Sequence, residues 1–171
     1  MQSLKKDALG KVQNLRYNSD MDKKNKKVIS TNRKAFHDYL IFDKYTAGIV
    51  LKGTEIKSIR RGAVNLKDSF AKVEKGEVFL YNCNISKYEQ GNRYNHEPER
   101  VRKLLLNRKE ILKMEMKIKK GGYTVVPLEM FLTGGYAKLE IALAKGKKLF
   151  DKRDDMVKKT QTRDIQRQIK R

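Results

Sequence analysis

The residues of this chain that could do chemistry are cations and aromatic rings rather than the groups that usually catalyse reactions. The segment KGKKLFDKR, residues 145–153, places Phe150 among four lysines and one arginine. A ring can stack on a nucleobase while neighbouring cations attract phosphates, so this segment is typical of a contact surface for nucleic acid. The alternative interpretation is a solvated chain end with one incidental apolar residue.

Groups suited to catalysis or metal binding are sparse. The only histidines are His37 and His96, and the only cysteine is Cys83. No Cys/His spacing matches a zinc site, and no phosphate-binding glycine loop or GxSxG motif occurs. The carboxylates are scattered and mostly neighbour lysines, as surface ion pairs do. We therefore expect no enzymatic activity, no metal and no cofactor, and we expect Cys83 to be a small buried hydrophobe.

The overall charge indicates a polyanionic partner. The 171 residues include 41 lysines and arginines against 20 aspartates and glutamates, a formal net charge of +21. Such a field favours nucleic acid or an anionic membrane. No apolar run approaches the roughly 18–20 residues of a membrane-spanning helix, and a single cysteine fits a reducing cytosol. We expect a cytoplasmic, monomeric protein that binds RNA and no membrane.

The cations of the middle of the chain are grouped in three segments, which are the candidate RNA contacts. NRKAFH supplies Arg33, Lys34 and His37, TEIKSIRR supplies Lys57, and RVRKLLLNRK supplies Arg102 and Lys103. Each group has a structural alternative. The histidine could be a partly buried strand residue, and the cations could lie on ordinary solvated helix faces.

Apolar periodicity over residues 32–144 predicts the elements that position these groups. Strands are expected at 39–42 and 47–51, on either side of a DKYT turn. GTEIKSIRRG, residues 53–62, then reads as a short helix with Thr54 as its N-cap.

A hairpin is predicted around the turn Lys75-Gly76. In its second strand Phe79, Tyr81, Cys83 and Ile85 alternate towards one face. The long segment VRKLLLNRKEILKMEMKIKK, residues 101–120, has a helical pattern in which Asn107 and Glu110 resemble a capping box. Two alternating strands follow, YTVVPLEMFL and YAKLEIALA.

Short strands with few helices predict a mainly β fold, a small antiparallel β-barrel of the oligonucleotide-binding type with peripheral α-helices. Residues 1–31 are basic and poor in large apolar side chains, so we expect a mostly disordered extension. Residues 145–171 carry eleven basic and four acidic residues. They are expected to form a basic tail that folds on a charged partner.

Six segments in this order resemble the family of the SsrA-binding protein, small protein B, the partner of tmRNA in bacterial trans-translation. They are NRKAFHDYLI, AGIVLKGTEIKSIRRGAVNLKDSFAKV, GEVFLYNCNIS, RVRKLLLNRKEI, YTVVPLEMFL and KLEIALAKGKKLFDKRD. The similarity runs from about Asn32 to Asp155, and the first 20 residues match nothing in the family.

The resemblance implies an oligonucleotide-binding barrel without enzymatic activity. It implies binding to the tRNA-like domain of tmRNA (SsrA RNA) and delivery of alanyl-tmRNA, with elongation factor Tu, to stalled ribosomes. The C-terminal tail would be flexible when free. On the ribosome it would become helical and lie in the empty mRNA path, near the decoding centre of the small-subunit rRNA.

By position, Leu105, Asn107 and Lys138 match family residues implicated in tmRNA binding. Thr46 stands where the family usually has the glutamate of EAG, so one acidic contact is replaced by a hydroxyl. The decoding-centre block of the family is matched by Gly146, Lys147, Lys148, Phe150, Asp151, Lys152 and Arg153. Composition alone would equally favour a ribosomal or ribosome-assembly protein with a barrel and basic tails.

Overall fold

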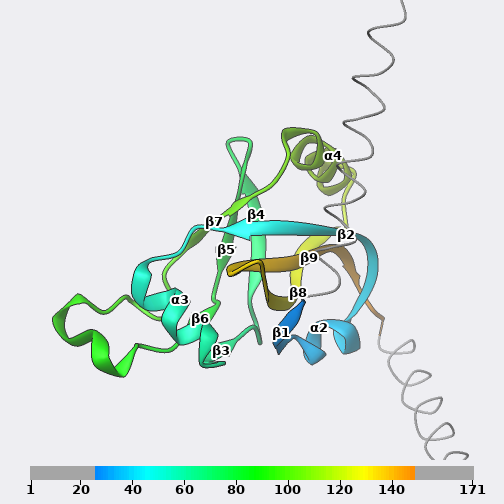
Figure 1. Cartoon of the computed structure of the whole chain (residues 1–171). Coiled ribbons are helices and arrows are strands. Elements are labelled where there is room, and N and C mark those ends of the chain that lie inside the picture. Colours follow the sequence, from blue (N-terminus) through cyan, green and yellow to red (C-terminus); the bar gives the residue numbers. More distant parts are fainter. Residues whose placement is uncertain (1–25, 149–171) are drawn as a thin grey trace, which may run out of the picture.

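The computed structural model describes residues 26–148, except for the side chains of residues 92–94. Figure 1 shows strands curled into a barrel, with α3 and α2 on opposite sides of it in this view. The elements in chain order are β1 (Lys27–Thr31), α2 (Arg33–Asp38), β2 (Tyr39–Ile49), α3 (Gly53–Arg60), β3 (Val64–Asn65), β4 (Phe70–Glu74), β5 (Glu77–Tyr81), β6 (Asn84–Ile85), a 3-10 helix η1 (Glu89–Tyr94), β7 (Arg102–Leu105), α4 (Arg108–Lys119), β8 (Thr124–Thr133) and β9 (Tyr136–Gly146).

Six antiparallel strands form the barrel wall, in the order β8-β4-β5-β7-β2-β9, and β9 pairs again with β8. The two long ladders, β2–β9 and β8–β9, make up most of this wall. The other edge of β8 pairs with β4 through one residue pair, Ala71 with Val125, and with β1 further along. The expected mainly β barrel of the oligonucleotide-binding type is confirmed, and its wall has a narrow seam between β4 and β8.

The barrel interior is filled by alternate residues of the strands, as a pleated sheet with one buried face requires. Leu80, Leu104, Leu139 and Ile141 are fully or almost fully buried. The helix α4 adds Ile111 and Met114 to this core, and α3 adds Ile59. Each helix therefore turns one apolar stripe to the barrel and leaves its opposite face to solvent.

A second, smaller core lies outside the barrel beneath α2. Ala35 of that helix packs on Val126 and Leu128 of β8 and on Ala142 and Ala144 of β9. Asn32 caps the helix, because its side-chain oxygen accepts a hydrogen bond from the Ala35 N–H at 3.1 Å. The small side chain of Ala35 lets this short helix lie close against the two strands.

Three sequence predictions of secondary structure were wrong. Residues 27–31, expected in a disordered extension, form β1 and pair with β8. The two strands expected around DKYT are one strand, β2, whose pairing with β9 shifts at an irregularity between Ile41 and Lys44. The beginning of the predicted long helix is strand β7, and the helix starts only after Asn107.

The hairpin predicted at Lys75-Gly76 is confirmed. Both residues have positive φ, 50° and 76°, as a two-residue turn of this kind requires. The predicted alternation beyond it fails, because Asn82 also has a positive φ of 54° and shifts the phase of the chain. Val78 and Leu80 are therefore buried in β5, whereas Cys83 and Ile85 are buried after the shift.

Cys83 is confirmed as a buried hydrophobe. Its side chain is inaccessible to solvent, and burial raises the pKa of the thiol to about 11. Within residues 26–148, none of the helices is long and apolar enough to cross a membrane.

Candidate nucleic-acid interface

The first group of predicted RNA contacts lies on the outer face of β7, β2 and β9. Leu105 of β7 is paired with Gly48 of β2, and Gly48 is paired with Lys138 of β9, so these positions form one row across three strands. Thr46 lies two residues before Gly48 and is exposed on the same face. We call Thr46, Gly48, Leu105, Asn107 and Lys138 the barrel face.

Gly48 explains how an apolar side chain can be presented on this face. A Cβ at that position would lie 3.5 Å from Leu105 Cδ1, an ordinary contact, and 3.3 Å from Leu105 Cβ, which is tighter than ordinary packing. The glycine therefore leaves room for Leu105 to lie over β2. The leucine is nevertheless 53% exposed, so about half of this apolar side chain faces solvent.

Asn107 is confirmed as the N-cap of α4. Its backbone N–H donates to Glu110 Oε2 at 3.0 Å, and its side chain is exposed. The backbone of this residue thus starts α4, two residues after β7 ends at Leu105. Its exposed amide group can donate and accept hydrogen bonds.

Many cations near the barrel face are already paired with carboxylates. Glu140 lies opposite Thr46 in the β2–β9 ladder and is bound by Lys44 at 2.9 Å and Lys26 at 3.7 Å. Lys103 of β7, a predicted contact, pairs with Glu77. The surroundings of the face are therefore not simply a field of positive charge, because Lys26, Lys44 and Lys103 are held in place by acidic neighbours.

Lys57, a predicted RNA contact, is exposed on α3. Its ammonium group lies 5.2 Å from the centroid of the Tyr88 ring, within the range of a cation–π interaction. Lys57 is therefore accessible to a partner, but it lies on α3 and not on the strands that carry Leu105, Gly48 and Lys138.

Arg102 cannot contact RNA in this structure, so its prediction is corrected. Its side chain is fully buried, and its guanidinium donates to Glu55 Oε1 at 2.9 Å, to the Cys83 carbonyl at 2.6 Å and to the Pro98 carbonyl at 2.8 Å. Every side of the cation is occupied by an acceptor within the fold. Arg102 therefore ties β7 to α3 and to the chain between β5 and β7.

Glu55 is the centre of this buried network and an exception to the expectation of surface carboxylates. It accepts hydrogen bonds from Arg100, from Arg102 and from the Lys52 N–H at 2.6 Å. Burial by itself would raise the pKa of this carboxyl, but the hydrogen bond from Arg100 and the other two donors outweigh it and lower the pKa below its ordinary value. The carboxylate stays charged and holds the start of α3 against β7.

The second group of predicted contacts lies at the other end of β2 and β9. Tyr39 is paired there with Gly146, nine residues along β2 from Gly48, which corresponds to roughly 30 Å. Lys147 donates its backbone N–H to the Asp38 carbonyl at 2.9 Å and its Nζ to the Phe36 carbonyl at 3.1 Å. The first residues of the predicted decoding-centre block therefore rest on α2.

The cations of α2 belong to this second group rather than to the barrel face. Arg33 and Lys34 are exposed on the helix, and Lys34 pairs with Asp68 at 2.5 Å, a hydrogen bond that raises the pKa of the lysine. His37, predicted as either an RNA contact or a strand residue, is in the last turn of α2, with Nδ1 2.9 Å from Asp38 Oδ1. We call Arg33, Lys34, His37, Lys147 and Lys148 the α2 end.

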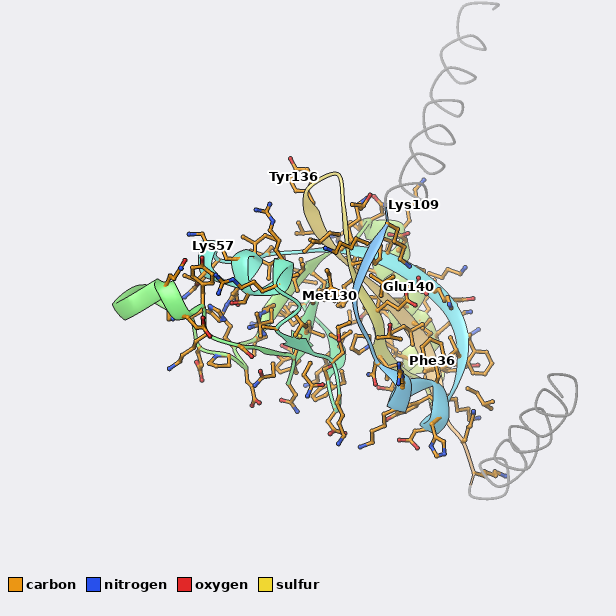
Figure 2. All side chains as sticks on the ribbon, turned by 60° about the horizontal axis from the view of Figure 1, so that its bottom comes forward. Phe36, Lys57, Lys109, Met130, Tyr136 and Glu140 are labelled. Atoms are coloured by element: carbon orange, nitrogen blue, oxygen red, sulfur yellow. The ribbon has the colours of Figure 1, made fainter. Side chains whose placement is uncertain are left out.

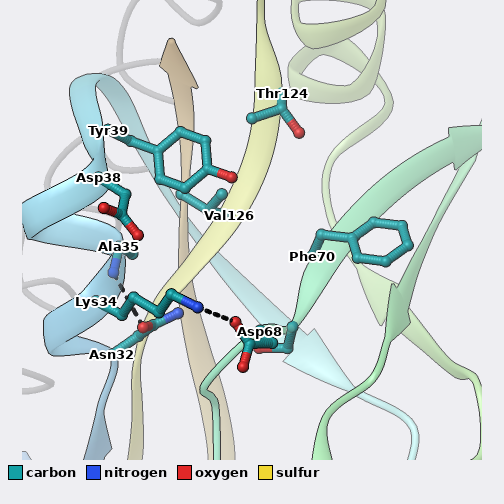
Figure 3. Close-up of a pocket in the computed structure, with 10 residues that line it drawn as sticks. Asn32, Lys34, Ala35, Asp38, Tyr39, Asp68, Phe70, Thr124 and Val126 are labelled. Carbon is teal, nitrogen blue, oxygen red and sulfur yellow. Dashed lines mark hydrogen bonds and ion pairs between the residues drawn. The ribbon is translucent and has the colours of Figure 1, made fainter. Parts of the chain in front are cut away.

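A pocket of about 360 Å³ opens between α2 and the barrel at this end. Figure 3 shows Tyr39 and Phe70 on its two sides and the Lys34–Asp68 ion pair across its mouth. Its walls mix rings with polar groups, which suits a planar polar group better than a purely apolar ligand. No cluster of acidic, histidine or cysteine side chains that could hold a metal occurs within residues 26–148.

The remaining residues of the predicted decoding-centre block, Phe150, Asp151, Lys152 and Arg153, lie outside the described residues. Sequence reasoning also missed Gly48 and Tyr136. Gly48 could have been identified from the sequence, because a glycine inside a strand often marks a place where another group comes close to the backbone. The second follows two glycines at the β8–β9 turn, and only its exposure of 75% in the structure makes it conspicuous.

Comparisons with known proteins place this chain among close relatives. The model of the family described as SmpB protein matches residues 29–171. An SsrA-binding protein of Geobacillus thermodenitrificans is 62% identical over 147 residues, which cover 86% of this chain and 95% of the relative. An SsrA-binding protein of Carboxydothermus hydrogenoformans is 56% identical over 144 residues, covering 84% of this chain and 97% of the relative.

A solved structure has the same fold. It is described as "tmRNA-SmpB: a journey to the center of the bacterial ribosome", and the matching chain is 47% identical, with a TM-score of 0.60. The match covers 70% of this chain and 85% of that one. Fold and sequence relatives therefore agree.

Proposed function

This chain belongs to the SmpB protein family, and from that premise we propose that it binds the tRNA-like domain of tmRNA and brings it to stalled ribosomes. Binding of tmRNA and action in trans-translation on the ribosome follow from the family and from the names of its relatives. The family is one of RNA-binding proteins and not of enzymes. The net charge of +21 suits such a partner.

The row of Leu105, Gly48 and Lys138 carries the proposal for the tRNA-like domain. It combines an exposed leucine, a glycine without a side chain and a lysine across three strands. Asn107, two residues after Leu105, adds an exposed amide. Leu105 packs over Gly48, and the part of its side chain that remains exposed can lie against a ribose or a base. The lysine and the amide supply the polar contacts that such a surface needs.

The α2 end is proposed to face the ribosome. Gly146, Lys147 and Lys148 begin the tail there, and Lys147 is bonded to α2. In this proposal the tail, including Phe150, Asp151, Lys152 and Arg153, becomes helical in the empty mRNA path and contacts small-subunit rRNA. The protein acts as a monomer, and elongation factor Tu brings alanyl-tmRNA with it.

Binding to a labelled tRNA-like domain, followed by fluorescence anisotropy, tests the role of the barrel face. Leu105→Ala and Lys138→Gln should each weaken binding, and Lys138→Gln should also reduce the dependence of log K on log[salt] by roughly 0.7–0.9 if the lysine meets a phosphate. Lys75→Gln is the matched control, because Lys75 is exposed at the tip of the β4–β5 hairpin. Equal effects of all three variants would contradict the assignment.

The second candidate function is that of a ribosomal or ribosome-assembly protein. Its distinguishing outcome is the RNA recovered from cells. Crosslinking, immunoprecipitation and sequencing should enrich tmRNA over bulk rRNA if the proposed function holds. Recovery of rRNA in proportion to its abundance, without tmRNA enrichment, would favour the assembly protein.

A further inference from the structure

Two pockets adjoin each other across the seam between β4 and β8. The pocket of about 360 Å³ at the α2 end, described above, has Phe70 and Thr124 in its wall. A second pocket of about 400 Å³ lies between α4 and these strands, and the same two residues belong to its wall. Because the pockets share these residues, they form one groove from α2 to α4. We call the residues that line the two pockets the seam groove.

The two halves of the seam groove differ in chemistry. The half at α2 contains Asp38 and Asp68 together with the ring of Tyr39 (Figure 3). The half at α4 is lined mainly by apolar residues, among them Val73 and Ile118. The first half suits a guanidinium group, because this planar cation can stack on a ring while carboxylates accept its N–H groups. The second half suits an apolar side chain.

The seam groove is electrically neutral, although the chain carries a net charge of +21. Its walls contain one lysine and two carboxylates at α2, and two lysines and one carboxylate at α4. Each of these lysines has a carboxylate within 3.1 Å, in the pairs Lys34–Asp68, Lys72–Glu74 and Lys119–Glu115. A phosphate backbone would therefore find all three lysines occupied and would be repelled by the carboxylates. The groove favours a protein segment over a nucleic acid, and the excess of negative charge at α2 favours a cationic residue there.

The edge of β4 in the groove is open to a further strand. Among residues 26–148, β4 pairs with β5 at all five of its residues but with β8 only at Ala71. Alternate residues of an antiparallel strand direct their N–H and C=O groups to opposite edges. Part of the backbone between Lys72 and Glu74 is therefore turned away from β5, where an extended peptide can bond to it as an added strand.

The seam groove is separate from the barrel face. In Figure 2, the helix that carries Phe36 and the β8–β9 hairpin that carries Tyr136 lie at opposite ends of the barrel. The groove belongs to the end at α2, because β8 contributes its first residues, Thr124 to Val126. None of the five residues of the barrel face lines either pocket. A segment in the groove thus leaves the barrel face uncovered.

We propose that the seam groove binds an extended segment of a second protein, which carries an apolar residue and, a few positions later, an arginine. The order follows from antiparallel pairing, which is the more stable arrangement. The chain runs from Asp68 in the α2 half to Val73 in the α4 half, so an antiparallel segment passes the apolar half first. Its apolar side chain fills the pocket at α4, and its arginine lies between Tyr39 and Asp68. This inference does not depend on the proposed function.

Titration of the isotope-labelled, full-length chain with synthetic peptides tests the proposal by NMR. The probes are short threonine-rich peptides with one leucine and, two or four positions later, one arginine. At least one of them should shift the amide signals of Val73, Tyr123 and Thr124. Replacement of its arginine by glutamate should weaken binding by roughly tenfold or more. Methylation of its backbone nitrogens should have a similar effect, because it removes the donors that pair with β4.

Asp68→Asn is the matched test on the protein. Asp68 has a φ of 61°, in the left-handed region that asparagine also adopts, so the variant removes the charge and keeps the backbone conformation. It should weaken binding of the arginine peptide about tenfold. Asp43→Asn is the control, because Asp43 also pairs with a lysine at 2.5 Å, Lys117, but lies outside the groove. It should leave peptide binding unchanged.

Three outcomes would overturn the proposal. The first is that no peptide of the set shifts the amide signals of the groove. The second is that the Asp68→Asn and Asp43→Asn variants bind the arginine peptide equally well. The third is that a single-stranded oligonucleotide shifts the same signals more strongly than any peptide, since the groove would then be a site for nucleic acid.

Discussion

The barrel face and the α2 end present similar residue types, but different parts of the fold hold them. On the barrel face, Leu105, Gly48 and Lys138 are placed by strand register across three strands, above a sheet anchored by the buried Glu55–Arg102 pair. At the α2 end, a six-residue helix rests on a small core, and Lys147 joins it through two hydrogen bonds to backbone carbonyls.

This difference suggests that the two regions bind their partners in different ways. A surface set by sheet register is rigid before it meets RNA, which limits the entropy lost on binding and favours affinity for one defined shape. A short helix followed by a basic chain can adapt to a second partner.

Removal of residues 149–171 should have the largest effect. It leaves the Lys147 contacts with α2 intact, so we expect binding to the tRNA-like domain to stay within about tenfold, or 1.4 kcal/mol. Tagging of stalled peptides should be abolished. The measurements are anisotropy for binding and a translation assay on a message without a stop codon. Loss of RNA binding far beyond tenfold would mean that the two regions do not act separately.

The Glu55 network should show the largest effect on stability. Glu55→Gln leaves the buried Arg102 without its countercharge, which should cost roughly 3–5 kcal/mol in the free energy of unfolding. Chemical denaturation measures this directly. The control Glu77→Gln removes the partner of Lys103 in an exposed pair and should cost about 1 kcal/mol or less. Equal losses in the free energy of unfolding for Glu55→Gln and Glu77→Gln would show that the buried Glu55–Arg102 pair does not stabilise the sheet beneath the barrel face.

The same carboxylate predicts how stability depends on pH. The pKa of Glu55 is lower in the folded state than its ordinary value near 4.5, so its contribution is fully present above that value and is lost as the pH falls through the folded pKa. Denaturation series below pH 4.5 should therefore show a shallower loss of stability in Glu55→Gln than in the unchanged protein. Parallel curves would contradict the assignment of a charged Glu55.

Substitutions of Phe150 test whether a single aromatic ring of the tail is needed for tagging. If it stacks on a base near the decoding centre, Phe150→Ala should reduce tagging roughly 5- to 150-fold. Phe150→Tyr and Phe150→His each keep a planar face and should retain tagging. Melting temperatures should not change in any of the three. A core ring would instead cost about 3–5 kcal/mol on truncation to alanine and would lower the melting temperature by several degrees.

Gly48→Val tests the barrel face by overpacking. A Cβ at this position already lies 3.3 Å from Leu105 Cβ, so the branches of valine must displace Leu105. Overpacking typically costs 1–3 kcal/mol, and we expect RNA binding to weaken about tenfold. Gly53→Ala is the matched control, because a Cβ there meets no atom within 4 Å. Tagging defects of Gly48→Val should be overcome by raising the concentration of tmRNA.

Removal of residues 1–20 should have the smallest effect. These residues match nothing in the family, and the shortened chain keeps Lys26, which binds Glu129 at 2.7 Å, and all of β1. RNA binding and tagging should be unchanged. Removal of residues 1–31 is the informative contrast, since it strips β1 from the edge of β8 and should lower stability. A defect from the shorter deletion would assign a role to the extension.

The sequence predicted those features whose causes are local. The turn at Lys75-Gly76, the cap at Asn107 and the barrel strands of the second half depend on neighbouring residues and on alternation, and the structure has them. The phase of the strands failed where one residue, Asn82, took a left-handed conformation. No pattern of the flanking apolar residues records such a shift.

The candidate site was predicted less completely because its burial and grouping depend on distant partners. Arg102 looked like its neighbour Lys103, but its acceptor, Glu55, is 47 residues away in the chain. Residues of α2 and of the barrel face looked equivalent in sequence, and only the β2–β9 register separates them by the length of a strand. Charge composition predicts that a partner is anionic, whereas register decides which cations can meet it together.

The narrow seam between β4 and β8 is expected to make local opening of the barrel easier there than elsewhere in its wall. One residue pair closes the wall there, and a pocket of about 400 Å³ between α4 and these strands adjoins it. Amides along such an edge are expected to exchange their hydrogens through small local openings, whereas the long β2–β9 ladder should exchange its hydrogens mainly when the whole domain unfolds. Thr46, Gly48 and Lys138 of the barrel face lie on β2 and β9, whose amides should exchange slowly. Local opening at the seam would therefore leave in place the strands that carry the proposed RNA-binding surface.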